Sequence, residues 1–196
     1  NFNATEIRTF NVTPPSGCGS ISASPTLINS VTSNGTCFTI TVNNVTLDCD
    51  GFSIFYDANG TGEDGVVVSS RTNVTVRNCI IRDINASGAG GVGINFTNTT
   101  NSNIINNTIY ANGTTNNYGI LFTDTADNTA QNNTIQTYTS STGNSFNAGI
   151  ALFQTNNSNI INNSISTNGL GSANYGIQLE NDVGRNQIMG NIISTN

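Results

Sequence analysis

The stretches SNIINNTIY (102–110) and SNIINNSIS (158–166) repeat one short pattern, in which an asparagine is followed two residues later by isoleucine. The pattern recurs along the chain at Asn78, Asn107, Asn133, Asn163 and Asn191. A glycine followed by an aliphatic residue recurs in phase with it, at Gly65, Gly93, Gly119, Gly149 and Gly176, with steps of 28, 26, 30 and 27 residues. Two series with one such period indicate a copied structural unit, as in solenoids, propellers and repeat arrays.

Within each unit the apolar residues alternate. The first and third positions after each glycine are apolar, as in Ile94 and Phe96, so these two side chains share one face of a strand. No stretch shows a 3.6-residue period, so almost no helix is expected. Short strands at this spacing predict stacked coils of two or three strands, in which equivalent residues of neighbouring coils lie above one another.

The two repeated series predict the corners of the coil. The asparagines are expected to point inward at a turn, in the left-handed conformation, and to form a hydrogen-bonded ladder along the axis. The glycines are expected to mark another turn with positive φ. A further apolar row is expected two residues before each asparagine, and Gln131 interrupts it; the row is Val76, Ile105, Ile161 and Met189.

Together with NVTLDCDGFSI (44–54) and NVTVRNCII (73–81), the repeated segments resemble the right-handed parallel β-helix repeat family. This family includes pectate-lyase-like enzymes, phage tailspikes and microbial surface proteins. The resemblance covers about residues 37–196 and implies an all-β fold, a single right-handed parallel β-helix of six to seven coils with 26–30 residues per coil. Residues 18–51 resemble the opening of archaeal surface-type members.

The chain divides into residues 1–16, a non-repeat N-terminal arm or cap, and residues 17–196, the parallel β-helix. Pro14 and Pro15 close the arm as an extended linker. The last coil begins at Gly176 and no polar cap follows it, which predicts an exposed, uncapped end. Identical subunits that stack head to tail, through this end and the N-terminal arm, are the predicted partners. Surface glycans are a second candidate partner.

Composition narrows the classes of function. The chain has 196 residues, of which only 8% are charged, and a formal net charge of −6. Five arginines form no basic stripe, so no nucleic-acid partner is expected. No apolar run is long enough for a membrane span. The chain begins with Asn1 rather than Met, which favours a processed, extracellular or cell-surface product.

Four cysteines stand in the first half of the chain, and an even number in a secreted-type sequence favours disulfides. Three pairings are open. Cys49 and Cys79 are 30 residues apart, about one coil, so they could stack; Cys18 and Cys37 would then close the entry to the solenoid. We therefore predict the disulfides Cys18–Cys37 and Cys49–Cys79, with buried free thiols as the alternative.

The sequon Asn-X-Ser/Thr occurs 14 times, somewhat more often than expected by chance. Asn-rich turns next to Thr-rich strands also generate sequons, but in a secreted archaeal or eukaryotic protein many would carry glycans. The predicted sites are Asn3, Asn11, Asn34, Asn44, Asn59, Asn73, Asn85, Asn95, Asn98, Asn106, Asn112, Asn132, Asn156 and Asn162. Covalent N-glycans are thus expected, and no other cofactor.

The acidic residues show no catalytic pattern. Cleavage of a sugar bond needs paired carboxylates at a fixed separation, and no three acids fall at one coil position. Asp48 and Asp50 share a face beside Gly51 and are interpreted as structural. Asp124 and Asp127 lie in a turn and are the acids to test for catalysis.

One Gly-rich loop, DANGTGED (57–64), carries oxygen ligands at every second residue, a spacing that a hard cation accepts. Asp57, Thr61, Glu63 and Asp64 are therefore weak calcium candidates, and a solvated turn is the alternative. No other metal site and no catalytic residue are predicted.

The sequence thus favours a secreted, N-glycosylated structural protein, the subunit of a filament or surface layer, rather than an enzyme. The alternative is a β-helix protein that binds or cleaves polysaccharide. A crystal-surface binder is a third hypothesis, but the threonine rows it needs do not persist through all coils.

Overall fold

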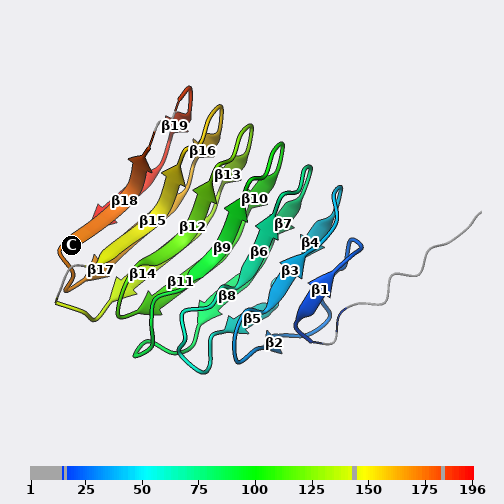
Figure 1. The fold of residues 1–196 in the computed structure, drawn as a ribbon, viewed down its shortest axis with the longest axis horizontal. Helices are drawn as coiled ribbons and strands as arrows, with labels where there is room; N and C mark the ends of the chain where they lie inside the picture. The colour runs from blue at the N-terminus through cyan, green and yellow to red at the C-terminus, as the bar shows by residue number, and fades with distance from the viewer. Residues whose placement is uncertain (1–14, 16, 143–144, 182–183) are drawn as a thin grey trace, which may run out of the picture.

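The computed structural model describes residues 15, 17–142, 145–181 and 184–196. Apart from Pro15, the predicted arm at residues 1–16 lies outside the described residues, as do the sequons at Asn3 and Asn11. All regular elements of the described part are β-strands, and they form three parallel sheets that wind around one axis, coil after coil (Figure 1). The predicted all-β solenoid is confirmed.

The three sheets follow one another within each coil. Sheet A contains β1 (Gly19–Ile21), β3 (Phe38–Ile40), β6 (Val66–Ser69), β9 (Val92–Thr97), β12 (Asn117–Thr123), β15 (Phe146–Phe153) and β18 (Ala173–Glu180). Sheet B contains β4 (Thr46–Asp48), β7 (Thr75–Arg77), β10 (Asn103–Ile105), β13 (Thr129–Gln131), β16 (Asn159–Ile161) and β19 (Gln187–Met189). Sheet C contains β2 (Val31–Thr32), β5 (Ser53–Tyr56), β8 (Ile80–Asp83), β11 (Thr108–Gly113), β14 (Thr134–Thr139), β17 (Ser164–Gly169) and β20 (Ile192–Thr195).

The core is a set of stacked apolar rows inside the coils. In sheet A the predicted row is formed, with Ile94, Ile120 and Ile150 in register and fully buried. Phe96 and Phe122 stack in the same way, and their rings meet edge to face at 5.8 Å. Each coil buries its apolar face against the next coil, so the core is continuous along the axis.

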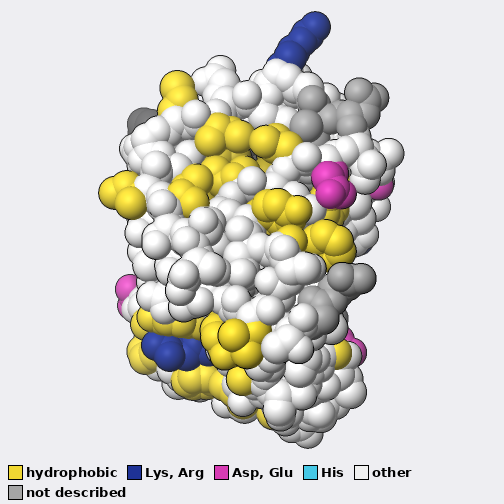
Figure 2. All heavy atoms as spheres, turned by 90° about the vertical axis from the view of Figure 1, so that its left-hand side faces the viewer, with side chains coloured by type: hydrophobic (Ala, Val, Ile, Leu, Met, Phe, Trp, Pro, Cys, Tyr) yellow, Lys and Arg dark blue, Asp and Glu magenta, His cyan; other side chains and the backbone are white. Residues whose placement is uncertain are grey.

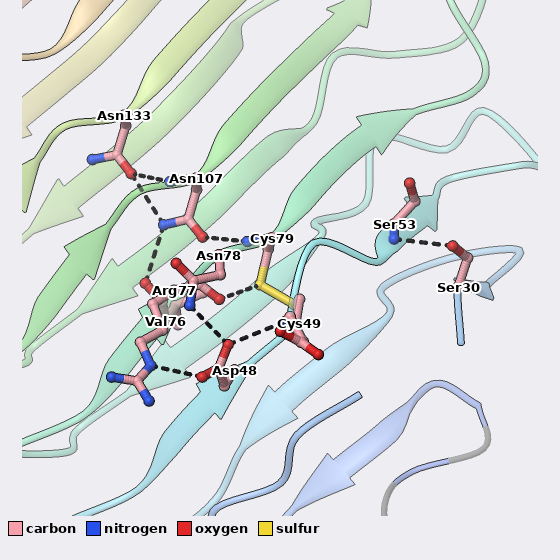
Figure 3. Close-up of a disulfide and its surroundings, with 11 residues drawn as sticks. Ser30, Asp48, Cys49, Ser53, Val76, Arg77, Asn78, Cys79, Asn107 and Asn133 are labelled. Atoms are coloured by element: carbon pink, nitrogen blue, oxygen red, sulfur yellow. Dashed lines mark hydrogen bonds and ion pairs between the residues drawn. A yellow bond between two sulfur atoms is a disulfide. The ribbon is translucent and has the colours of Figure 1, made fainter. Parts of the chain in front are cut away.

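The asparagine ladder is formed inside the corner between sheets B and C (Figure 3). The Asn107 Nδ2 donates to Asn133 Oδ1 at 3.0 Å, and Asn133 Nδ2 donates to Asn163 Oδ1 at 2.9 Å. The main-chain N–H of Asn107 donates to the same Asn133 oxygen at 2.9 Å, and Asn133 Nδ2 also donates to Ile104 O at 2.9 Å. The side chains are almost fully buried, so the ladder satisfies polar groups that the fold removes from water.

The left-handed residue of this corner is not the ladder asparagine but the residue before it. Asn106, Asn132 and Asn162 have φ values of 57°, 56° and 54°. A left-handed residue between two extended ones interrupts the in-out alternation of the strand. The inward apolar position is therefore three residues before the ladder asparagine, not two: Ile104, Ala130 and Ile160 are buried, and Gln131 lies on the other face and interrupts nothing.

The first member of the predicted ladder is shifted by one residue. Strand pairing aligns Ile80 with Thr108 and Ile81 with Ile109, so Cys79 rather than Asn78 occupies the ladder position. Cys79 donates its main-chain N–H to Asn107 Oδ1 at 3.0 Å. Its sulfur is bonded to Cys49 of the preceding coil, so a disulfide replaces the amide at the N-terminal end of the ladder (Figure 3).

Both predicted disulfides, Cys18–Cys37 and Cys49–Cys79, are formed, and no described cysteine is free. Disulfides of this kind are typical of oxidising compartments, which is consistent with secretion.

A second ladder, which the sequence analysis did not find, lies in the corner between sheets A and B. Ser102, Asn128, Ser158 and Asn186 alternate there, and each side-chain oxygen accepts the main-chain N–H of the preceding coil at 2.8–3.2 Å. This position is serine in some coils and asparagine in others, so no single residue type repeats there in the sequence.

The repeated glycines do not mark a turn. They lie within or beside the sheet A strands, and none of the five has positive φ. A Cβ built on Gly119 would lie no more than 2.6 Å from Ile135 Cγ2 and from the carbonyl oxygen of Gly149. The same conflict with a sheet C isoleucine recurs at the other four, so glycine is required here for close packing of sheet A against sheet C.

Candidate functional site

The loop that precedes β6 is held by hydrogen bonds within the protein. The carboxylate of Asp57 accepts the N–H groups of Thr61 and Gly62 at 2.9 and 3.1 Å. Asp64 accepts from the Val92 N–H at 3.1 Å and from Asn95 Nδ2 at 2.9 Å. Their oxygens therefore serve the turn and the next coil.

The other two calcium candidates face elsewhere. Glu63 accepts from Thr36 Oγ1 at 2.8 Å, and the Thr61 hydroxyl donates to Asn59 at 3.2 Å. In the part of the chain that the structure describes, no three acidic or sulfur-containing side chains are grouped as a metal site would require. The four residues thus do not converge on one centre, and calcium binding stays a prediction.

The remaining acids noted in the sequence stand apart. The carboxylate of Asp48 accepts hydrogen bonds from Arg77 Nε at 2.9 Å and from Asn78 Nδ2 at 3.0 Å (Figure 3). Partial burial opposes ionisation, but the Asn78, Asp50 and Arg77 contacts outweigh it and lower the pKa of Asp48. Asp124 and Asp127 are exposed, left-handed corner residues with φ of 54° and 56°.

Asp83 is a buried acid that the sequence did not single out. It is 4% exposed and lies directly opposite Tyr56 in the pairing of β5 with β8. Burial is the main cause that raises its pKa to about 7; main-chain N–H groups of Asn85 and Asn112 oppose the shift, and the charge of Asp57 adds to it. The folded chain therefore holds a proton on Asp83 at pH values where the unfolded chain does not.

This shift predicts a fall in stability as the pH rises. Between the ordinary pKa of 3.8 and about 7 the folded state binds more protons than the unfolded state, so the free energy of unfolding falls and levels off above pH 7. The whole pKa shift of Asp83 lowers the free energy of unfolding by no more than about 4 kcal/mol. We expect Asp83→Asn to raise Tm at pH 8 and to flatten the Tm profile between pH 4 and 8. The exposed Glu180→Gln should leave the slope in place; an unchanged profile in Asp83→Asn would contradict the assignment.

The outer face of sheet A carries a group of aromatic side chains in the later coils. Tyr118, Ala148 and Tyr175 are in register across β12, β15 and β18. The rings of Tyr118 in β12 and Phe153 in β15 pack edge to face, with their centroids 6.1 Å apart. Ala151, which lies in β15 with Phe153, is fully buried. This arrangement places aromatic rings on the outer face of sheet A, and we call the group the aromatic platform: Tyr118, Phe153 and Tyr175.

Polar groups border the platform. Glu180 lies opposite Phe153 in the next strand and accepts from Gln178 Nε2 at 3.0 Å. Burial, and secondarily the charge of Glu180, raises the pKa of Tyr118, so its hydroxyl stays protonated and can donate a hydrogen bond. On the neighbouring coil toward the N-terminus, Asn95 lies opposite Leu121 and is tied to Asp64.

The sequence did contain a signal for this platform. Tyr118 and Tyr175 each stand directly before a glycine of the repeated series, at Gly119 and Gly176. A tyrosine at the same place in two units is an outward residue, because the glycine beside it faces sheet C. The search for paired acids overlooked it.

The sequons differ in their surroundings. Asn106, Asn132 and Asn162 are exposed and form a row along the corner between sheets B and C. Asn34, Asn44, Asn59, Asn73, Asn98 and Asn156 are exposed as well. Asn85, Asn95 and Asn112 are only partly exposed, and the amide nitrogen that a glycan would modify is bonded to Asp64 in Asn95 and to Ala58 O in Asn85. Glycosylation stays a prediction, and these contacts disfavour Asn85 and Asn95.

Among the described residues no helix is long and apolar enough to cross a membrane. No curated protein matches the chain in sequence.

Three solved structures are similar to this chain at low sequence identity. DFA-IIIase from Arthrobacter chlorophenolicus A6, without its lid, is 10% identical with a TM-score of 0.45, and the match covers 89% of this chain and 54% of that chain. Endopolygalacturonase I from Stereum purpureum, complexed with two galacturonate, is 17% identical with a TM-score of 0.40, covering 90% and 69%. The A-module of the mannuronan C-5 epimerase AlgE4 from Azotobacter vinelandii is 16% identical with a TM-score of 0.33, covering 89% and 78%. This chain thus spans about half the length of the first of them.

These neighbours correct one prediction. The sequence analysis concluded that the chain is not an enzyme, yet all three solved proteins are enzymes by name, so the fold does not support that conclusion. At this identity the likeness concerns the fold alone and assigns no activity to this chain. A family model settles the relationship more firmly, because the one described as the right handed beta helix region matches residues 18–193. The chain belongs to the right-handed β-helix family.

Proposed function

We propose that this protein binds an extended, uncharged polysaccharide along the outer face of sheet A. The aromatic platform carries the proposal. The C–H faces of sugar rings are apolar and pack against aromatic rings, while tyrosine hydroxyls and carboxylates hydrogen-bond the sugar hydroxyls at the ring edges. Tyr118 and Tyr175 are two strands apart, about 10 Å, which suits successive contacts with a chain that runs along the solenoid axis.

Charge favours an uncharged ligand. The formal net charge is −6, and Glu180 borders the platform. Of the arginines, Arg82 stacks on Tyr110 of sheet C, and Arg77 pairs with Asp48 at the end of sheet B. A polyanion would meet repulsion from Glu180 and from the net negative charge at this face. The neutral hexoses and pentoses are therefore the first ligands to test.

Two tyrosines of equal exposure allow a matched test. Tyr175 on the platform and Tyr138 on sheet C are each 40% exposed. We expect Tyr175→Ala to weaken binding of a neutral oligosaccharide about tenfold, the loss of roughly 1.4 kcal/mol, as measured by calorimetry. Tyr138→Ala should bind as the unaltered protein does. Equal losses in both variants, or no binding across neutral and acidic glycans, would overturn the proposal.

The same glycan panel tests for catalysis. Product release by the unaltered protein, and its loss in Glu180→Gln or Asp64→Asn with binding retained, would extend the proposal from binding to cleavage. Asp127→Asn serves as the control, because Asp127 lies at the corner that follows sheet A. Asp124→Asn tests a nearer acid, since the Asp124 main-chain N–H donates to the carbonyl oxygen of the platform residue Phe153 at 3.0 Å.

A second candidate function, carried over from the sequence analysis, is head-to-tail stacking with a second copy at the last described coil. Ile188 and Leu179 occupy rows that are buried in earlier coils, yet they are 40% and 43% exposed. Figure 2 faces this end and shows apolar side chains gathered between polar ones. β18, β19 and β20 are also the outermost strands of their sheets in the described structure. A coil from a second copy would cover both the apolar rows and the strand edges.

This stacking predicts concentration-dependent assembly. We expect the protein to sediment as larger species with rising concentration and to form rods in electron micrographs. Ile188→Asp should abolish the effect, since it places a charge within the covered rows. Ile84→Asp, at an exposed residue between sheets C and A, is the matched control. A single monomeric species at all concentrations would contradict the candidate.

A further inference from the structure

The interior corner between sheets C and A becomes polar along the axis. Tyr56 and Asp83 face each other across β5 and β8, and Ala111, Thr137 and Thr167 are in register across β11, β14 and β17. The pairing of Arg82 with Tyr110 joins the two sets, because it places Asp83 beside Ala111. One inward row thus carries a phenol, a carboxyl, a methyl and two hydroxyls in succession.

Several oxygens in this corner have no hydrogen-bond partner among the described residues although they are buried. They are Tyr56 OH, Asp83 Oδ2, Asn117 Oδ1, Thr137 Oγ1, Ser145 Oγ, Asn147 Oδ1 and Thr167 Oγ1. All seven residues are at most 4% exposed. Buried polar atoms in native proteins almost always have a partner in the protein or in ordered water, so a contiguous set of this kind requires an explanation.

The orientation of the Asn147 amide is fixed by the hydrogen bonds of its nitrogen. Asn147 Nδ2 donates to Asn168 O at 3.0 Å, which links sheet A to sheet C. Asn168 directly follows Thr167 in the chain. The unpartnered Asn147 oxygen therefore lies in the same coil layer as Thr167. Rotation of the amide would place its oxygen against that carbonyl, so the Oδ1 atom cannot exchange places with the donor.

The row also changes in size. In the first of these coils the Tyr56 ring fills the corner and reaches within 3.4 Å of the position where a Cβ of Gly91 would stand. One coil beyond Asp83 the inward residue is Ala111, in the coil that begins at Gly91. A methyl group there stands between the carboxyl of Asp83 and the hydroxyl of Thr137. The smallest side chain of the row is thus flanked by two unpartnered oxygens.

We propose that this corner binds a file of ordered water molecules, which bridge Asp83, Thr137, Asn147 and Thr167 inside the solenoid. Water is the ligand that this chemistry selects. It donates to the amide and carboxyl oxygens and exchanges bonds in both directions with hydroxyls, and each bound molecule needs two to four polar partners. In a dry corner each of these groups would stay buried without a hydrogen-bond partner, which destabilises the folded state.

A crystal structure at about 1.5 Å resolution tests the proposal directly. We expect well-ordered water density within hydrogen-bond distance of Thr137 Oγ1, and further density beside Asn147 Oδ1 and Thr167 Oγ1. An empty corner, or side chains turned to bond the protein instead, would overturn it.

Thr137→Val gives a second test, because valine has the shape of threonine without the hydroxyl. In a hydrated corner the variant loses a water contact, so Tm falls and the neighbouring density disappears. In a dry corner the variant removes an unpaired hydroxyl, so Tm stays the same or rises, and the proposal fails. Thr139→Val is the matched control: that hydroxyl is equally buried but donates to Thr114 O at 3.1 Å, so its loss lowers Tm in either case.

Discussion

Asn133→Ala is expected to destabilise the protein by roughly 3–5 kcal/mol, far more than a substitution of the adjacent Asn132. The Asn133 side chain accepts two hydrogen bonds from Asn107 and donates two, to Ile104 O and Asn163 Oδ1, in a corner closed to water. Alanine would leave these partners buried and unpaired. Urea unfolding measured with unglycosylated protein gives the difference directly.

Asn132→Gly is the control for that change. Asn132 is exposed and left-handed with φ of 56°, a conformation that glycine adopts at no steric cost. We expect this variant to be as stable as the unaltered protein or slightly more stable. If Asn133→Ala and Asn132→Gly unfolded at the same urea concentration, the ladder would not be the source of stability that the geometry implies.

Gly119→Ala is the second change with a large expected effect. The added Cβ would overlap Ile135 Cγ2 and approach the Gly149 carbonyl oxygen, and neither the core row nor the backbone of the next coil can yield without displacing others. We expect a loss of about 3 kcal/mol or more, or failure to fold.

Two further variants separate the steric cause from a general intolerance of alanine. Gly35→Ala places its Cβ no closer than 3.5 Å to Glu63 and should be nearly neutral. Combining Gly119→Ala with Ile135→Ala should cost less than the sum of the two changes, because the second removes the atom that the first overlaps. Strict additivity in the double variant would refute the explanation.

The fold could be predicted from the sequence because stacking makes equivalent residues repeat. Ile94, Ile120 and Ile150 lie above one another, so their spacing in the chain reports the length of a coil. The disulfide between Cys49 and Cys79 followed from the same period. Each of these inferences needs only the distance along the chain between like residues.

The predictions that were wrong concerned which way side chains point, inward or outward. The left-handed Asn106 reverses the in-out alternation, so counting by twos from Asn107 placed Ile105 inside, where the structure has Ile104. The cause of the glycine series was also hidden, because Gly119 owes its identity to Ile135, which lies two strands ahead in a different sheet.

The candidate site was harder still. Tyr118 and Phe153 meet only because the rings lean toward each other over the small residues of β15, and spacing along the chain says nothing about this. Asp83 looked like an ordinary polar residue at the end of a strand. Its burial depends on the row it joins in sheet C, opposite Tyr56.

The amide ladder has a sense of direction. From Asn107 to Asn191 every side-chain N–H between the asparagines donates toward the C-terminal end of the solenoid. Dipoles arranged head to tail polarise one another, so each added member strengthens those already present. The asparagine of a duplicated coil, inserted anywhere in the ladder, could accept a hydrogen bond from the coil before it and donate one to the coil after it. Such a molecule can lengthen or shorten in evolution by whole coils, with its stability changing in even steps.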